Sequence, residues 1–271
     1  MTHLTQTAKA LQFLTLAVRS PAEAYDRLFT KIDAVQEGSS GKPPVYIPTG
    51  YPVAISGLLK QFPGLDWCAE ESGLREIEAQ VRSKLASMPA EAPFRLSHNA
   101  DFTLARYCYL ACRLLKPEIA VETGVCYGLA TAFLLAAMRA NGRGRLYSID
   151  LPPLGVDSDK WVGILIPPEL RDRWQLIRGS SKRELPKLAG SLGKIDFFFH
   201  DSLHTHKNIT FELNTIGARL SPRAIVIADD VDGNQAFANW IAATSPAFSA
   251  IVQEADKPSM FGISVHGSRA E

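Results

Sequence analysis

Residues 118–128, with the sequence Glu-Ile-Ala-Val-Glu-Thr-Gly-Val-Cys-Tyr-Gly, decide the fold class of this chain. The apolar run 119–121 predicts a buried parallel strand, and the Ala- and Leu-rich residues 129–139 predict the helix that follows it. Because Gly124 and Gly128 carry no Cβ, the backbone between strand and helix can pass close to a ligand. The first turn of that helix offers unpaired N–H groups to an anionic group. The stretch therefore predicts a strand–turn–helix unit that binds a ligand at its turn.

The spacing within this turn separates it from a dinucleotide-binding turn. Dinucleotide sites carry the pattern G-x-G-x-x-G. The pattern here is E-x-G-x-x-x-G beginning at Glu122, which suits a cofactor with an amino group and a carboxylate, such as S-adenosylmethionine (SAM). A second strand, predicted over 145–149, ends at Asp150, where an acidic side chain accepts hydrogen bonds from ribose hydroxyls. The alternative is that Glu122 and Asp150 only cap loops, and the turn by itself does not exclude a nicotinamide cofactor.

Strands and helices alternate after residue 118. Such alternation predicts an α/β fold with a doubly wound, mostly parallel, Rossmann-like sheet that helices cover on both faces. The last two strand-like runs flank Pro258 and predict a closing hairpin, which adds an antiparallel strand at the sheet edge. The seven predicted strands cover residues 118–122, 145–149, 174–178, 195–200, 224–228, 247–253 and 261–265.

The N-terminal third predicts a helical extension, residues 1–95, ahead of a SAM-binding domain, residues 96–271. Pro21 suits the first turn of a second helix, and the Gly- and Pro-rich residues 37–54 predict a loop. The first helix is amphipathic, so its apolar stripe either packs on the domain or joins copies of the chain in a homo-oligomer. Further helices are predicted over residues 74–88 and 101–115.

Composition excludes several classes of protein. A net charge of +1 with 21% charged residues provides no basic surface for nucleic acid. The apolar run 10–18 is too short to span a bilayer, so stable membrane insertion is not expected. The four cysteines form no C-x-x-C pair, and Cys108 and Cys112 share one face of a predicted helix as core residues. We therefore expect a reduced, cytoplasmic protein.

Acidic side chains follow the fourth and fifth predicted strands. Asp201 comes after the fourth strand, and Asp229 and Asp230 come after the fifth. Parallel sheets bind ligands outside the carboxyl ends of their strands, so the three carboxylates would converge there and repel one another unless a cation relieves them. Carboxylate oxygens suit Mg²⁺, Mn²⁺ or Ca²⁺, of which Mg²⁺ is expected. The competing interpretation is solvated loop acids and helix N-caps.

Histidines cluster after the fourth predicted strand. His204 lies three residues beyond Asp201, and an imidazole with an ordinary pKa near ~6.5 can take a proton from a substrate hydroxyl at neutral pH. The alternatives for His204 are a zinc site shared with His206 or a structural role. His206 is expected to cap or open the next helix, and His200 to pack beneath the site.

Five motifs follow one another along the chain. They are Val-Glu-Thr-Gly-Val-Cys-Tyr-Gly (121–128), Tyr-Ser-Ile-Asp (147–150), Arg-Gly-Ser-Ser (178–181), Phe-His-Asp-Ser-Leu-His-Thr-His (199–206) and Ile-Ala-Asp-Asp (227–230). Their order resembles the class I SAM-dependent methyltransferases. Within this class, the chain is similar to the bacterial branch that includes macrocin O-methyltransferase and cephalosporin hydroxylase. The D-x-x-H motif, together with the acidic pair after the fifth strand, is the most specific part of the likeness.

The resemblance implies a cofactor site at the first three strand ends. Glu122, Gly124 and Gly128 would frame the methionine end of SAM. Asp150 would hold the ribose, and Ser180 would lie near the adenine.

The resemblance also implies roles for the acids and the histidine of the later strands. Asp201, Asp229 and Asp230 would be the ligands of the divalent cation, Asp201 would also border the cofactor, and His204 would be the catalytic base. Catechol O-methyltransferase, a more distant relative, has an amide where this chain has Asp230, so the acidic pair is closer to the macrolide-sugar branch.

The implied activity is a metal-assisted O-methyltransferase that acts on a hydroxyl of a small molecule or glycan. One alternative is a hydroxylase-like enzyme on the same scaffold, because fold does not fix function. Another is a SAM-binding interaction protein without turnover. The insert 151–173 is expected to form a lid or an acceptor wall, with Trp161 either contacting the acceptor or packing in the core.

Overall fold

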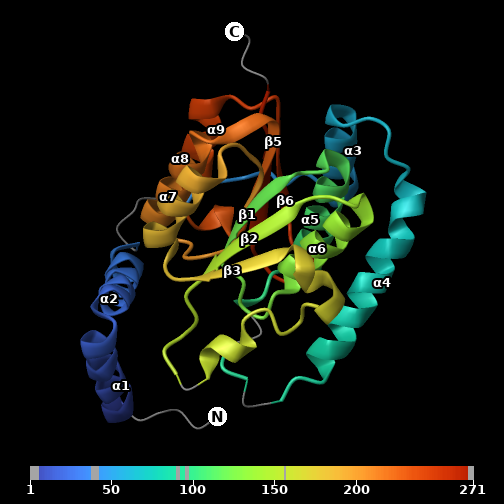
Figure 1. Ribbon diagram of the computed structural model, residues 1–271. Helices are drawn as coiled ribbons and strands as arrows, with labels where there is room; N and C mark the ends of the chain where they lie inside the picture. The colour runs from blue at the N-terminus through green and yellow to red at the C-terminus, as the bar shows by residue number, and fades with distance from the viewer. Residues whose placement is uncertain (1–5, 38–42, 90–91, 95–97, 156, 268–271) are drawn as a thin grey trace.

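Seven strands form one sheet at the centre of the computed structural model: β1 (Ile119–Thr123), β2 (Arg145–Asp150), β3 (Trp174–Arg178), β4 (Ile195–His200), β5 (Leu220–Ala228), β6 (Phe248–Gln253) and β7 (Met260–Val265). They lie in the order β3-β2-β1-β4-β5-β7-β6 (Figure 1). β1 to β5 are parallel, so their carboxyl ends meet at one edge. This is the predicted doubly wound, mostly parallel α/β fold. The structure describes residues 6–37, 43–89, 92–94, 98–155 and 157–267.

The carboxyl-terminal hairpin places its second strand inside the sheet. β7 runs antiparallel to both β5 and β6 and lies between them, so β6 is the edge strand. The predicted antiparallel strand is therefore real, but its predicted position at the edge is wrong. Burial explains the order, because every residue of β7 after Met260 is buried, whereas residues of β6 alternate between buried and accessible.

Two groups of helices cover the two faces of the sheet (Figure 1). One hydrophobic cluster joins the sheet to α3 (Tyr51–Gln61), α4 (Trp67–Ala86), α5 (Phe102–Leu115) and α6 (Leu129–Asn141). A second cluster joins the opposite face to α7 (Ser181–Leu192), α8 (His206–Gly217) and α9 (Ala236–Thr244). Cys108 and Cys112 are buried core residues in the first cluster, as predicted.

Helix α3 begins inside the segment predicted to be a loop. The prediction for residues 37–54 is wrong from Tyr51 onward, because Pro52 occupies the first turn of a helix, where its missing N–H costs no helical hydrogen bond. Ile55 and Leu58 are buried in the same cluster as α5 and α6. The proline therefore marks a helix start and not an irregular loop.

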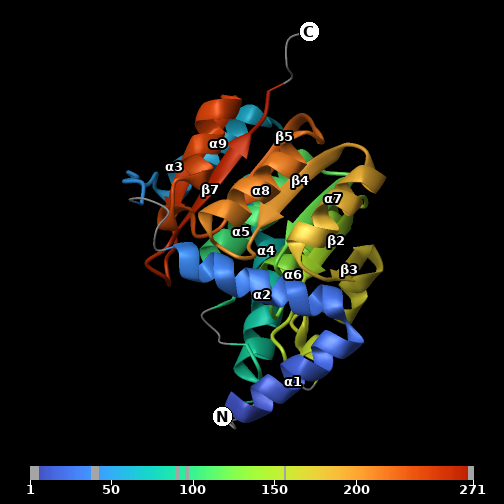
Figure 2. The same ribbon diagram turned by 90° about the vertical axis from the view of Figure 1, so that its left-hand side faces the viewer.

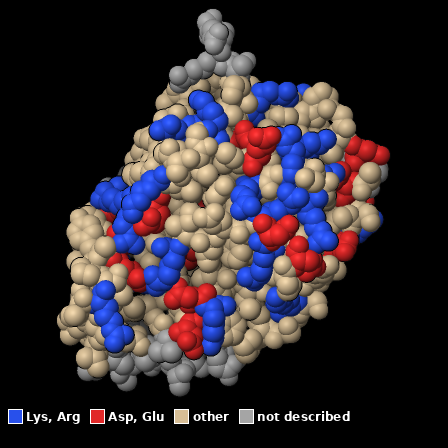
Figure 3. All heavy atoms as spheres, in the orientation of Figure 1, with Lys and Arg blue, Asp and Glu red and all other residues tan. Residues whose placement is uncertain are grey.

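Helices α1 (Gln6–Arg19) and α2 (Pro21–Gln36) contact each other and contribute no described side chain to either hydrophobic cluster. Leu14, Val18 and Val35 are 63%, 84% and 83% exposed. Self-association through these helices stays a prediction, as does the domain boundary after residue 95. Within the described ranges, every helix is too short or too polar to cross a membrane. The face drawn in Figure 3 mixes basic and acidic side chains, without a continuous field of either sign.

Candidate active site

A cavity of about 760 Å³ lies at the carboxyl ends of the parallel strands. This is where open parallel sheets bind their ligands. Its lining combines the turns that follow β1, β2 and β3 with the segments that follow β4 and β5. Of the predicted site residues, Glu122 and Gly128 do not line the cavity, whereas it does include Gly124, Asp150, Ser180, Asp201, His204, Asp229 and Asp230.

The two glycines of the first turn are required by packing. Gly124 has a φ of +85°, and a Cβ on it would lie 1.8 Å from the carbonyl oxygen of Asp201. Gly128 has a φ of +86°, and a Cβ there would lie 2.8 Å from the Cα of Gly163, on the insert that follows β2. Gly124 therefore lets the loop after β4 approach the cofactor turn. Gly128 instead packs the insert, so its predicted place beside the methionine end of SAM is not supported.

Asp150 joins the end of β2 to the turn after β1. Its Oδ2 accepts hydrogen bonds from the backbone N–H groups of Val125 at 2.6 Å and Cys126 at 2.9 Å. Burial raises the pKa of Asp150, and these two hydrogen bonds act in the opposite direction. One carboxylate oxygen thus fixes the turn, and the side chain still borders the cavity where the sequence predicts a ribose.

Glu122 lies beneath the cavity and not in its lining. Its carboxyl group accepts hydrogen bonds from the hydroxyls of Ser148 at 2.5 Å and Thr131 at 3.0 Å, and the residue is 1% exposed. Burial raises the pKa of Glu122 to about 8, although both hydrogen bonds lower it. Glu122 thus links β1, β2 and α6 and does not line the cavity, and its contact with the methionine end of SAM stays a prediction.

Ser180 begins α7 at the edge of the cavity. It is the N-cap residue, and its hydroxyl accepts a hydrogen bond from the backbone N–H of Arg183 at 3.3 Å. Ser180 borders the same cavity as Asp150, beyond the end of β3. This arrangement is compatible with the predicted adenine contact.

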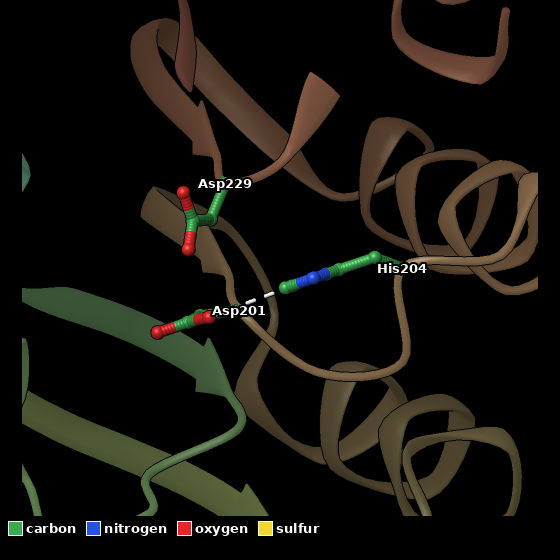
Figure 4. A group of neighbouring side chains, drawn as sticks. All are labelled: Asp201, His204 and Asp229. Atoms are coloured by element: carbon green, nitrogen blue, oxygen red, sulfur yellow. Dashed lines mark ion pairs between the residues drawn. The ribbon is translucent and has the colours of Figure 1, made fainter. Parts of the chain in front are cut away.

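Asp201, His204 and Asp229 bring three potential metal-ligand atoms within 4.8 Å of one another. Figure 4 shows the three side chains, with the His204 ring pointing toward Asp201. The Nε2 atom of His204 lies 3.5 Å from Oδ1 of Asp201. Asp229 is 1% exposed, and burial together with the charges of Asp201 and Glu254 raises its pKa well above the ordinary value. A cation among these atoms would relieve the repulsion between the acids.

Asp230 lies on the other side of the His204 ring. Its Oδ2 lies 2.6 Å from His204 Nδ1, and it is not part of the group of three ligand atoms. Burial alone would raise the pKa of Asp230, but the hydrogen bond from His204 lowers it to about 2. The sequence places Asp230 among the cation ligands. In the structure its carboxylate pairs with the imidazole of His204 and lies outside the group of three ligand atoms.

Both carboxylates also affect the protonation of His204. Burial alone would lower its pKa, but the neighbouring carboxylates of Asp201 and Asp230 raise it well above 6.5. His204 thus lies between two acids, with a fixed partner on Nδ1 and with Nε2 facing Asp201.

Glu212 supports the site from beneath and was not predicted from the sequence. Its buried carboxylate accepts hydrogen bonds from Ser202 Oγ and from His200 Nδ1, each at 2.7 Å, and from Asn208 Nδ2 at 3.0 Å. This network fixes the loop that carries Asp201 and His204. His200 packs beneath the site, as predicted. The sequence feature that points to it is the position of Glu212 on the apolar stripe of α8, three residues after Ile209, where an acid is unexpected.

The insert after β2 divides into a cavity-lining part and a core part. Leu151, Pro153 and Leu154 border the cavity. Farther along, Leu165 is fully buried, and Trp161 packs against the first hydrophobic cluster, with its ring centroid 6.5 Å from that of Tyr127. The middle of the insert therefore packs into the core through Val162, Leu165, Ile166 and Leu170, and the core interpretation of Trp161 is the one that the packing supports.

Residues 121–231 match a family model described as a methyltransferase domain. The chain carries a methyltransferase domain. The matched segment runs from β1 to the residues just after β5, so it contains the strand ends that build the cavity. The prediction of a class I methyltransferase is confirmed at the level of the class, whereas the bacterial branch stays a prediction. No curated protein matches the chain.

Solved structures of methyltransferases share the fold of this methyltransferase domain. An O-methyltransferase from Bacillus cereus in complex with SAH is 17% identical, with a TM-score of 0.54, over 79% of this chain and 97% of its own. TomG from Streptomyces achromogenes, an O-methyltransferase of tomaymycin synthesis in complex with SAM, is 16% identical with a TM-score of 0.55, over 80% of this chain and 96% of TomG. A methyltransferase from Geobacter sulfurreducens is 18% identical with a TM-score of 0.50, over 84% of this chain and 100% of its own. At these identities the likeness shows the fold alone.

Proposed function

We propose that the chain is a SAM-dependent, cation-assisted O-methyltransferase that acts on a hydroxyl of a small molecule or glycan. The observation that carries the proposal is that one cavity joins Asp150, at the predicted ribose position, to the group of Asp201, His204 and Asp229. The SAM- and SAH-bound O-methyltransferases of the same fold support it. When bound, SAM supplies a sulfonium methyl group, and the enzyme must place a hydroxyl oxygen in line with it.

The chain's own residues position the cofactor. The oxygen of Asp150 that does not hold the first turn would accept the ribose hydroxyls. The backbone around Gly124 would border the methionine end, and Ser180 would border the adenine.

In its neutral form, which the raised pKa favours only at higher pH, His204 would accept the hydroxyl proton of the acceptor. Asp230 holds Nδ1 of the imidazole at 2.6 Å, which fixes the ring and leaves Nε2 as the proton-accepting atom on the cavity side. This is the arrangement of a base oriented by a carboxylate.

The residues present fit a divalent cation. Asp201 and Asp229 offer carboxylate oxygens within 4.8 Å of each other, and the charge of Asp201 helps to raise the pKa of the buried Asp229, a repulsion that a cation would relieve. Two carboxylates with room for water suit Mg²⁺ or Mn²⁺. Such a cation would lower the pKa of the acceptor hydroxyl.

The cofactor assignment is tested by Asp150→Ala. We expect the affinity for S-adenosylhomocysteine to fall by roughly 1–3 kcal/mol, because buried polar groups lose a partner. Isothermal titration calorimetry measures the change. Asp157→Asn is the matched control, since Asp157 is an exposed acid that pairs with Lys160 and does not line the cavity. Equal affinity for the Asp150 variant and the wild type would refute the ribose assignment.

The cation assignment is tested with Mn²⁺, whose binding can be followed by electron paramagnetic resonance without any turnover. We expect one Mn²⁺ site that Mg²⁺ competes for, and Asp229→Asn should weaken it by at least about tenfold. The same variant should unfold no more easily than wild type without cation, because an amide removes the repulsion with Asp201. Asp172→Asn, an exposed acid far from the cavity lining, should bind Mn²⁺ normally. Unchanged Mn²⁺ binding by Asp229→Asn would contradict the assignment.

A further inference from the structure

Helix α2 forms the outer wall of the cavity. Asp26, Phe29, Thr30, Lys31 and Asp33 of α2 line it, opposite the strand ends that carry the predicted cofactor and cation residues. In Figure 2, α2 lies crosswise below α7 and α8. A segment more than 80 residues before the first strand thus completes the site.

Acidic side chains attach α2 to this edge of the sheet. Asp33 forms an ion pair with Lys207 at 2.8 Å, and Asp26 forms one with Arg183 at 3.2 Å. These basic partners occupy the first turns of α8 and α7, directly behind the strand ends.

Two further contacts extend the attachment at both ends of α2. Glu23 pairs with Arg178, the last residue of β3. Glu37, just after α2, accepts a hydrogen bond from the backbone N–H of His206 at 2.8 Å. The acids therefore bind basic or N–H groups along the whole edge from β3 to α8.

Nonpolar packing contributes little to this attachment. The described side chains of α2 belong to neither hydrophobic cluster, whereas α3 and α4 are anchored in the first. Phe29 packs against Tyr25 of the same helix, with ring centroids 4.4 Å apart, and outside α2 its ring lies near two cations, Lys182 Nζ at 4.9 Å and Lys207 Nζ at 6.0 Å from its centroid. An element held by partly exposed charge pairs opens at lower cost than one held by a core, and salt weakens its attachment.

We propose that α2 is the gate of the cavity: it detaches to admit or release ligands and is held closed by the ion pairs of Asp26 and Asp33. The inference rests on the proposed function only in that S-adenosylhomocysteine is the ligand behind the gate. Because the closed wall retards exit, weakening the ion pairs should speed dissociation of the ligand. Neither Asp26 nor Asp33 is among the residues predicted to hold the cofactor.

The test compares the dissociation rate of S-adenosylhomocysteine, measured by stopped-flow displacement, in wild type and in Asp26→Asn/Asp33→Asn. We expect the rate to rise about tenfold in the double variant. In wild type the rate should also rise between about 0.05 M and about 0.5 M NaCl, because salt screens the ion pairs. This salt dependence should be weaker in the double variant, which of the ion pairs described above keeps only that of Glu23 with Arg178, and general destabilisation does not produce that outcome. The matched control is Glu71→Gln/Glu76→Gln, which neutralises two acids of α4 away from the cavity.

Hydrogen exchange of the full chain gives a second measurement. Saturating S-adenosylhomocysteine should slow amide exchange in α2 and leave α4 unchanged. If the ligand binds but α2 exchange, the dissociation rate and its salt dependence all match the control, the gate is refuted and the proposed function stands. If the ligand does not bind at all, both are refuted.

Discussion

His204→Ala lowers turnover by ~10²–10⁴-fold, the usual cost of removing a positioned base, while the affinity for S-adenosylhomocysteine stays near that of wild type. The reason is geometric: Asp230 holds Nδ1, so Nε2 is the atom that takes the acceptor proton. Formation of S-adenosylhomocysteine, with an acceptor found by screening hydroxylated small molecules and glycans, measures the rate.

Two variants distinguish a catalytic role of His204 from a role in which it only holds the loop in place. His204→Gln can keep a hydrogen bond but cannot serve as a comparable base, so it should be nearly as slow as His204→Ala. His206→Ala is the matched control, because His206 starts α8 and its ring is not part of the cavity lining. A Gln variant within a few-fold of wild type would show that His204 only braces the loop.

Glu212→Ala lowers the free energy of unfolding by about 3–5 kcal/mol, because removing one partner of a buried charged network leaves the others unsatisfied. Four groups lose Glu212 as a hydrogen-bond acceptor: the hydroxyls of Thr123 and Ser202, the imidazole of His200 and the amide of Asn208. Urea unfolding followed by circular dichroism measures the loss. Glu76→Ala, on the outer face of α4, is the control and should change stability little.

Acid unfolding provides an independent check on Glu212. Burial alone would raise the pKa of this group, but the adjacent His200 and hydrogen-bond donors lower it to about 2, from 4.5. A folded-state pKa below the unfolded value stabilises the protein above pH 4.5, and this stabilisation is lost as the pH falls toward 2. Glu212→Gln should therefore flatten the decline of stability in that interval. A decline identical to that of wild type would mean that Glu212 does not carry the effect.

Local patterns were sufficient to predict the sheet and the main site. The parallel strands contain short apolar segments that an acid or glycine closely follows, so the pattern identifies both the strand and the residue at its tip. Because the carboxyl ends of parallel strands meet at one edge, the sequence alone places Asp150, Asp201 and Asp229 around one ligand site, and all three line the cavity.

Features that depend on which partner a side chain faces, or on packing between segments far apart in the sequence, could not be predicted in this way. The sequence identifies Asp230 as an acid at a strand end, but only the structure shows that its carboxylate pairs with His204. Glu122 and Glu212 differ from exposed acids only through burial, which depends on helices packed above them. The place of α2 over the cavity depends on ion pairs to residues more than 150 positions away.

Calorimetric titration of the full chain with SAM, and in parallel with NAD⁺, with and without Mg²⁺, tests the proposed function most directly. We predict that SAM binds with one molecule per chain, that NAD⁺ gives no binding heat, and that Asp150→Ala reduces the SAM heat. Binding of NAD⁺ in place of SAM, or no binding of SAM under either condition, would contradict the assignment of the cavity to a methyl donor.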